Sequence, residues 1–174
     1  MIYYNILYIK HVYSEDCMYS LFKPVEADLV LGSVFELSGE YLASHGIRVL
    51  IADLDNTVGK NSEKTPREEI VEWVKSLRDN GISLAVVSNN TMERVGKFCE
   101  PLGIKDYYWR SGKPRIRAIK MAMERLGGTV GTTALVGDKY TTDVLGAKRL
   151  GIMAIKVSKL KKRKVFLCEK NNDN

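Results

Sequence analysis

Short apolar runs and longer amphipathic segments alternate along most of the chain. Five runs have the length and composition of buried strands, at 48–52, 82–87, 106–109, 133–136 and 152–157. Between them, apolar side chains recur at helical spacing, which predicts helices at 66–80, 91–100, 114–126 and 141–150. Strict alternation favours right-handed crossovers and a parallel sheet covered on both faces. We therefore expect an α/β fold, a three-layer Rossmann-like sandwich with a five-stranded, mostly parallel sheet.

The segments outside this alternation set the expected domain limits. Residues 24–46 carry a helical pattern, with Ser38 as a candidate N-cap, and predict one or two short lead-in helices. A chain of 174 residues suits one domain with a substantial core. We predict that domain over 24–158, after a loosely packed extension at 1–23 and before a basic tail at 159–174.

Composition excludes several classes of protein. The hydrophobic fraction of 45% and the charged fraction of 28% are those of an ordinary globular protein. Three widely spaced cysteines argue against a disulfide framework and fit a reducing compartment. No apolar run approaches the roughly 20 residues of a membrane-spanning helix, and no signal peptide is recognisable at the N-terminus. A cytoplasmic location is therefore expected.

Much of the net charge of +6 lies in one place, because residues 156–164 include six basic residues and no acid. The plain interpretation is a solvated run that aids solubility. The alternative is peripheral contact of Lys159–Lys164 with an anionic membrane, where each basic residue contributes about 1 kcal/mol. Nucleic acid is not the expected partner, since no aromatic interleaving or known binding module accompanies the basic run.

Polar residues with chemical potential follow four of the predicted strands. Ligands of an open parallel sheet bind at the carboxyl ends of its strands, so these exits locate a candidate site. The exits carry Asp53 and Asp55 after the first strand, Ser88 and Asn89 after the second, Lys113 after the third, and Asp138 and Asp143 after the fourth.

These residue types suit a metal ion and a phosphoryl group. The spacing of Asp53 and Asp55 points both carboxylates the same way at a strand end, where like charges need a positive partner. Carboxylates are the preferred ligands of hard divalent cations, whereas Ser88, Asn89 and Lys113 supply donors and positive charge for phosphate. Taken singly, each has a plainer interpretation: the serine and asparagine as helix caps, the lysine as a surface residue.

Four segments together resemble the motifs of the haloacid dehalogenase superfamily: Asp53-Leu-Asp-Asn-Thr57, the strand ending in Ser88, Lys113, and Gly137-Asp-Lys-Tyr-Thr-Thr-Asp143. The resemblance covers roughly residues 48–157. The Asp-Leu-Asp-Asn-Thr form, the Ser-Asn-Asn turn, the Lys-Pro pair and Thr-Asp-Val-Leu-Gly-Ala are similar, more narrowly, to capless class III phosphatases, the subfamily of YqeG-like proteins and mitochondrial phosphatidylglycerophosphate phosphatases.

The resemblance implies hydrolysis through an aspartyl-phosphate. Asp53 would be the nucleophile, and Asp55 would protonate the leaving oxygen and then activate water. Mg²⁺ would be held by Asp53, the Asp55 carbonyl and Asp138. The implied phosphate ligands are Ser88, Asn89 and Lys113, and the implied supporting residues are Thr57 and Asp143, the latter by orienting Lys113 or a metal-bound water.

Short connections predict that no large cap domain covers the site. About ten residues separate Thr57 from the helix at Pro66, and nothing long enough for a domain lies between Ser88 and Lys113. An open site suits large substrates, headgroups at a surface, or a homo-oligomer in which a neighbour serves as lid.

We therefore predict a Mg²⁺-dependent phosphatase of phosphate monoesters, either phosphorylated small molecules or lipid headgroups, with phosphatidylglycerophosphate as the preferred substrate. The alternative within the enzyme class is a soluble nucleotide or sugar phosphate. From another class, the alternative is a non-catalytic phosphate-binding module. Asp55 argues against that module, because a pure binder has no need of an acid/base residue.

Overall fold

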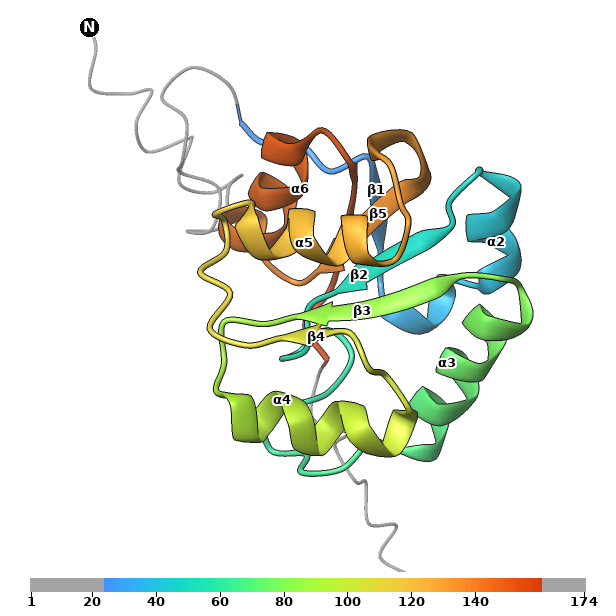
Figure 1. Ribbon diagram of the computed structural model, residues 1–174, viewed down its shortest axis with the longest axis vertical. Helices are drawn as coiled ribbons and strands as arrows, with labels where there is room; N and C mark the ends of the chain where they lie inside the picture. Colours follow the sequence, from blue (N-terminus) through green and yellow to red (C-terminus); the bar gives the residue numbers. More distant parts are fainter. Residues whose placement is uncertain (1–23, 161–174) are drawn as a thin grey trace, which may run out of the picture.

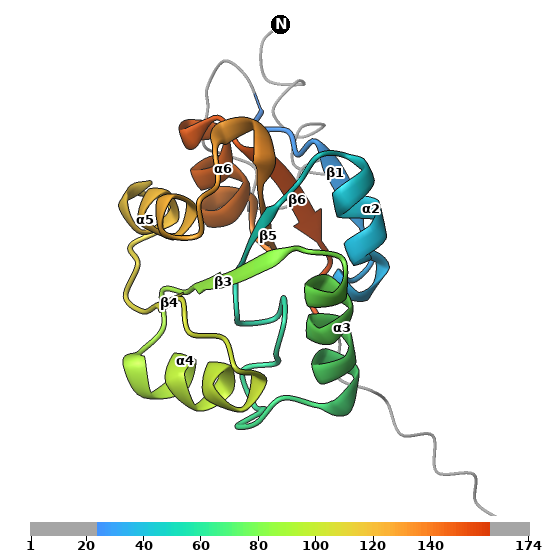
Figure 2. The same ribbon diagram turned by 45° about the vertical axis from the view of Figure 1, so that its right-hand side comes forward.

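The structure, a computed structural model, describes residues 24–160, and its centre is a six-stranded parallel sheet (Figures 1 and 2). The strand order is β1-β6-β5-β2-β3-β4. The strands are β1 (Leu29–Leu31), β2 (Val49–Ala52), β3 (Ser83–Val87), β4 (Tyr107–Tyr108), β5 (Thr133–Gly137) and β6 (Met153–Val157). The predicted extension at 1–23 and residues 161–174 of the predicted tail lie outside the described residues.

Helices cover both faces of the sheet, which gives the three predicted layers (Figure 1). One face carries α2 (Gly39–Ser44), α3 (Glu68–Asp79) and α4 (Met92–Cys99), and the other carries α5 (Arg117–Arg125) and α6 (Leu145–Leu150). The shorter turns are η2 (Val34–Glu36), η3 (Glu100–Leu102), η4 (Val130–Thr132) and the π-helical η5 (Tyr140–Val144). Between residues 24 and 160, no helix is long and apolar enough to cross a membrane.

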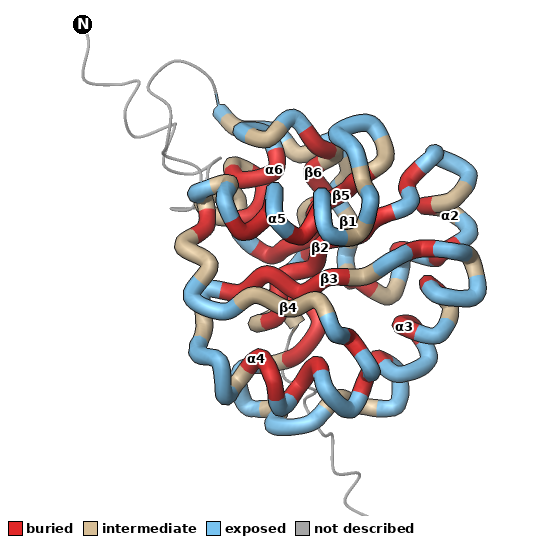
Figure 3. The backbone as a smooth tube through the Cα atoms, in the orientation of Figure 1, coloured by how far each residue is buried: buried red, intermediate tan, exposed pale blue. Residues whose placement is uncertain are grey.

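Alternate residues of the central strand β2 enter two separate cores. Leu50 and Ala52 pack on the side of α2, α3 and α4, whereas Val49 and Ile51 pack on the side of α5 and α6. All four are buried, and Figure 3 shows buried positions along the central strands and the inner faces of the helices. Burial on both faces explains why this strand is apolar throughout rather than alternating.

The prediction of five strands is wrong by one, because Leu29–Leu31 forms β1 instead of part of a helix. This strand pairs with β6 at the sheet edge, with Leu29 opposite Ile155. A segment of three residues is too short to show the alternating pattern that indicates a strand. Its conformation is therefore decided by pairing with β6. Ser38 caps α2 as predicted, since its hydroxyl accepts a 3.0 Å hydrogen bond from the Tyr41 N–H.

Strand register brings the predicted site residues to one edge of the sheet. Ala52 lies opposite Val136 of β5, and the Asp53 N–H extends this pairing by donating to the Val136 carbonyl at 2.9 Å. Asp138 follows two residues after Val136, and Ser88 follows the last residue of β3. The carboxyl ends of β2, β3 and β5 therefore present these side chains side by side.

Candidate active site

The loop after β2 folds tightly around one carbonyl. The Leu54 carbonyl accepts hydrogen bonds from the N–H groups of Thr57, Val58 and Gly59 at 2.9–3.3 Å. Asn56 adopts a left-handed conformation with a φ of 65°, which asparagine tolerates better than most residues. The loop thus turns back at once and keeps Asp55 near the strand end.

Four buried charged residues form a group that we call the buried charge cluster: Asp53, Lys113, Asp138 and Asp143. The Lys113 Nζ lies 2.7 Å from Asp53 Oδ1 and 2.7 Å from Asp143 Oδ1. Burial by itself lowers the pKa of Lys113, but the two carboxylates outweigh that effect and raise it. Lys113 is therefore the positive partner of Asp53, one of the two strand-end acids, and it also pairs with Asp143.

Gly137 makes the approach of Asp143 sterically feasible. A Cβ at position 137 would lie 2.3 Å from the Asp143 Cγ, far inside van der Waals contact. The Asp143 Oδ2 also accepts a 3.1 Å hydrogen bond from the Lys139 N–H, which fixes the carboxylate at the start of η5. The glycine before Asp138 is thus a packing requirement of the site.

The cluster carries more negative than positive charge. One oxygen each of Asp53, Asp138 and Asp143 lies within 4.8 Å of the others. Three carboxylates against one ammonium leave a formal charge of −2 when all are ionised. Among the described residues, neither buried carboxylate oxygen of Asp138 has a hydrogen-bond partner, and burial raises the pKa of Asp138. Oxygen ligands with excess negative charge fit a hard divalent cation.

Burial also raises the pKa of Asp53, to about 7, although Lys113 acts in the opposite direction. The Asp53 Oδ2 accepts a 3.4 Å hydrogen bond from the Thr57 hydroxyl, which is fully buried. Thr57 therefore contacts Asp53 as a supporting residue would. A cation beside Asp53 would favour its ionised form.

Ser88 and Asn89 lie at the end of β3 but have different partners. Ser88 is buried, and its Oγ accepts a 3.2 Å hydrogen bond from the Asn90 N–H. The Asn89 Oδ1 accepts from the Ser111 hydroxyl at 2.7 Å and from the Lys113 N–H at 2.8 Å, and its amide donates to the Lys113 carbonyl at 3.1 Å. Asn89 thus holds the loop that carries Lys113, and its predicted contact with phosphate stays a prediction.

Asp55 is held by two residues that the sequence analysis does not single out. The Asn90 amide donates to Asp55 Oδ2 at 2.8 Å, and the Arg94 Nη2 lies 3.3 Å from Asp55 Oδ1. We call Asp55, Asn90 and Arg94 the Asp55 fork. No local spacing identifies it, because Asn90 precedes the Thr91 cap of α4 and the contact of Arg94 depends on how α4 packs against the β2 loop.

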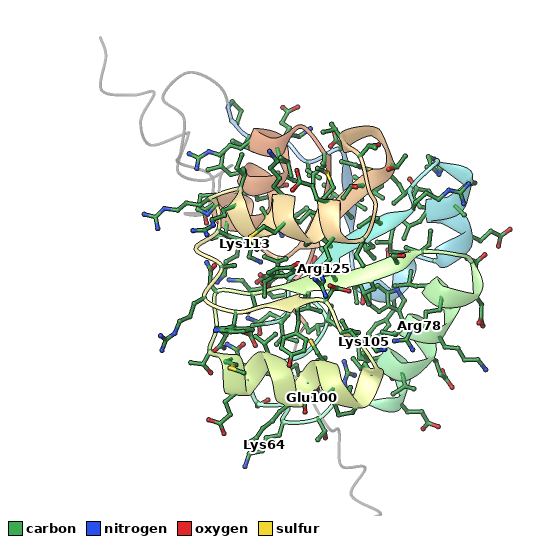
Figure 4. The ribbon with its side chains drawn as sticks, viewed as in Figure 1. Lys64, Arg78, Glu100, Lys105, Lys113 and Arg125 are labelled. Atoms are coloured by element: carbon green, nitrogen blue, oxygen red, sulfur yellow. The ribbon has the colours of Figure 1, made fainter. Side chains whose placement is uncertain are left out.

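Residues of the buried charge cluster and of the Asp55 fork line one cavity of about 320 Å³. Figure 4 labels Lys113, which lies on the loop between β4 and α5 and lines this cavity. Five of the predicted residues line it, namely Asp53, Asp55, Ser88, Asn89 and Lys113. The lining residues absent from the prediction are Asn56, Asn61, Asn90, Lys139 and Thr142.

The sequence profile of the haloacid dehalogenase-like hydrolases matches residues 14–151. The chain belongs to this family. It is 32% identical to the probable phosphatase YqeG of Bacillus subtilis over 130 residues, which are 75% of this chain and 75% of YqeG. It is 30% identical to the pyrophosphatase PpaX of Halalkalibacterium halodurans over 95 residues, 50% of this chain and 44% of PpaX.

A solved structure shows the same fold. An uncharacterized protein from Listeria monocytogenes serotype 4b matches 67% of this chain and 84% of its own with a TM-score of 0.54 and 19% identity. The family resemblance predicted from the motifs, including the YqeG-like subfamily, is confirmed. This haloacid dehalogenase-like protein is a phosphatase, and within residues 24–160 its β2–α3 and β3–α5 connections hold no cap domain.

Proposed function

We propose that this phosphatase hydrolyses phosphate monoesters by phosphoryl transfer to Asp53, assisted by Mg²⁺. The observation that carries the proposal is the buried charge cluster. A buried lysine paired with two carboxylates, beside a third buried carboxylate at a cavity, is costly to bury. A site that must bind both a cation and a phosphoryl group accounts for that arrangement.

The residues fit a magnesium ion. Asp53, Asp138 and the Asp55 carbonyl would hold it, and the partnerless oxygens of Asp138 support this assignment. When bound, the ion supplies positive charge that stabilises the phosphoryl oxygens. Asp143 would remain with Lys113, 2.7 Å away, because its other oxygen already accepts a 3.1 Å hydrogen bond from the Lys139 N–H.

The chemistry then follows from the two acids of the β2 loop. The Asp53 carboxylate attacks phosphorus, and the bond from phosphorus to the ester oxygen breaks. Asp55 gives its proton to that oxygen, so the alcohol leaves neutral. Asp55 then takes a proton from water as the water attacks the aspartyl-phosphate, and free Asp53 and inorganic phosphate result.

Donors around the cavity would stabilise the transferring group. Ser88 and Lys113 are both buried and both line the cavity, so they would bind phosphoryl oxygens where water screens little. Asn89 would act mainly by fixing the Lys113 loop, as its three hydrogen bonds to residues 111–113 suggest.

Activity against simple esters tests this proposal. Purified protein with Mg²⁺ should release phosphate from p-nitrophenyl phosphate, and EDTA should abolish the release. Asp53→Asn should lower the rate at least about 10⁴-fold, because the nucleophile is gone. An acid-quenched reaction should contain phosphoprotein that hydroxylamine cleaves. Wild-type rates in the Asp53→Asn variant would refute the mechanism and favour the non-catalytic binding module.

The substrate proposed is a phosphomonoester on a lipid headgroup, of the phosphatidylglycerophosphate kind. The cavity is small and has no cap among the described residues. The Leu160 N–H donates to the carbonyl of Asn56, a cavity residue, at 3.0 Å. The basic run Lys159–Lys164 therefore starts at the cavity mouth, where it would meet an anionic surface.

Vesicles separate this substrate from a soluble nucleotide or sugar phosphate. Activity on vesicle-borne phosphatidylglycerophosphate should greatly exceed activity on soluble glycerol phosphate. Neutralising residues 161–164 should weaken binding to anionic vesicles, by about 1 kcal/mol per charge at low salt. Neutralising Lys97 and Lys120, which lie on the exposed helix surfaces of α4 and α5, is the control when the two losses are compared per charge removed. Equal rates on both substrates would favour the soluble alternative.

A further inference from the structure

The side chain of Asp55 contacts two residues from outside its own loop. Asn90 lies just before helix α4, and Arg94 lies within it. The Asn90 amide donates a 2.8 Å hydrogen bond to Oδ2, whereas Oδ1 forms an ion pair with the Arg94 Nη2 at 3.3 Å and has no hydrogen-bond partner among the described residues. The same Nη2 donates to the Lys60 carbonyl at 2.9 Å. One guanidinium thus joins the acid to the far end of the loop that contains it.

Arg94 is itself fixed by packing. Its guanidinium lies over the ring of Phe98, 5.1 Å from the ring centroid, and only 15% of the side chain is exposed. Phe98 is fully buried, and a Cβ on Gly59 would come within 2.6 Å of its ring. The glycine, the ring and the guanidinium therefore pack together, and the arginine has little freedom to leave Asp55.

This packing leaves part of the hydrogen-bonding capacity of Arg94 unsatisfied. Its Nε and Nη1 are buried and have no hydrogen-bond partner among the described residues. A guanidinium buried with unsatisfied donors is unfavourable for stability. Its position is explained by what it does to the Asp55 carboxylate, which lines the catalytic cavity.

The fork is also tied to the phosphate-binding end of β3. The Asn90 N–H donates to the Ser88 Oγ at 3.2 Å, and Thr91 caps α4 by accepting from the Arg94 N–H at 3.4 Å. Ser88, Asn90 and Arg94 are therefore parts of one short rigid segment. The separation between the phosphate donors and the acid is set by that segment.

We propose that Asn90 and Arg94 are positioning residues that aim the Asp55 carboxyl at the ester oxygen of the substrate. This rests on the acid role proposed for Asp55. The rival is a purely structural tie between the β2 loop and α4, which would affect all substrates alike.

Two esters of similar shape distinguish these ideas. The phenolate of p-nitrophenyl phosphate leaves readily without a proton, whereas that of phenyl phosphate depends on the acid. Arg94→Gln should therefore lower kcat/KM for phenyl phosphate about 100-fold, and that for p-nitrophenyl phosphate less than about fivefold. The ratio of kcat/KM for p-nitrophenyl phosphate to kcat/KM for phenyl phosphate should therefore rise at least about tenfold. The affinity for Mg²⁺ should stay unchanged.

Arg67 provides the matched control. It also pairs with a carboxylate, Glu63, at 3.0 Å and also lies over a phenylalanine ring, Phe35, at 5.8 Å. It has no contact with Asp55, so Arg67→Gln should leave the substrate ratio at the wild-type value. Asn90→Ala should raise that ratio severalfold, and it tests the proposal independently if Arg94→Gln does not fold.

A double mutant separates failure of this inference from failure of the proposed function. In an Asp55→Asn background, Arg94→Gln should change kcat/KM less than about twofold, because its effect passes through Asp55. An Asp55→Asn variant with an unchanged substrate ratio would overturn the acid role itself. A shifted ratio in Asp55→Asn, together with unchanged ratios in both Arg94→Gln and Asn90→Ala, would overturn positioning alone.

Discussion

Two carboxylates of one loop lie in different surroundings, although a single residue separates them. Asp53 belongs to the buried charge cluster, where burial raises its pKa to about 7 and Lys113 lies 2.7 Å away. Asp55 belongs to the Asp55 fork, with a side chain 18% exposed and held by an amide and a guanidinium. Environment thus distinguishes the two carboxylates, because residue type does not.

The two groups also differ in what supports them. The cluster is set on the exits of β2 and β5 and on the Lys113 loop, so sheet register fixes its geometry. The fork connects a loop to the first turns of α4. Changes in the cluster should therefore alter stability and activity together, whereas changes in the fork should alter mainly the chemistry.

Removal of the lysine should break the cluster most severely. Lys113→Met leaves the buried carboxylates of Asp53 and Asp143 without their cation, so activity should fall about 10³-fold and the free energy of unfolding by about 3–5 kcal/mol. Denaturant unfolding and steady-state assays measure both. Lys120→Met is the control, since its ion pair with Glu124 is exposed and worth less than about 1 kcal/mol. Equal stability losses in the two variants would contradict the assigned role of the cluster.

The sequence predicts the cluster better than the fork for a physical reason. Strand ends are recognisable from apolar runs, and parallel strands bring their ends together, so Asp53, Lys113 and Asp138 could be assigned to one site. Arg94 lies inside a helix, where its contact with Asp55 depends on how α4 packs against the β2 loop. No local pattern specifies that packing.

Two other features could not be predicted from the sequence for the same reason. Strand β1 depends on pairing with β6, and the role of Asn89 depends on the path of the 111–113 loop. Both are tertiary contacts between segments more than 20 residues apart. Motif spacing placed Asn89 at the site, whereas the packing of the 111–113 loop determined its hydrogen-bond partners.

Crowding at Gly137 should damage the cluster and leave the fork intact. Gly137→Ala would place a Cβ 2.3 Å from the Asp143 Cγ, so Asp143 must move and Lys113 loses a partner. We expect the free energy of unfolding to fall by about 1–3 kcal/mol, with lower activity on phenyl and p-nitrophenyl phosphate alike. Gly131→Ala is the control, because nothing lies within 4 Å of its added Cβ. A changed substrate ratio in Gly137→Ala would show that the two groups are coupled.

Mg²⁺ binding should depend on pH through the Asp53 carboxylate. The pKa of Asp53 is raised from an ordinary value of about 4 to about 7, so the metal-free fold binds this proton more tightly than the unfolded chain does. Its contribution to stability is therefore fully present below about pH 4 and is lost as pH rises through about 7.

Mg²⁺ must displace the same proton, so its affinity should fall about tenfold per pH unit below 7 and level off above it. Thermal unfolding with and without Mg²⁺ at pH 5 to 8 measures this as a stabilisation that grows with pH. Asp53→Asn should flatten the dependence, because no proton then competes at position 53. Arg94→Gln should keep it, since the fork does not hold this proton; a flattened curve in that variant would mean that the two carboxylates titrate as one unit.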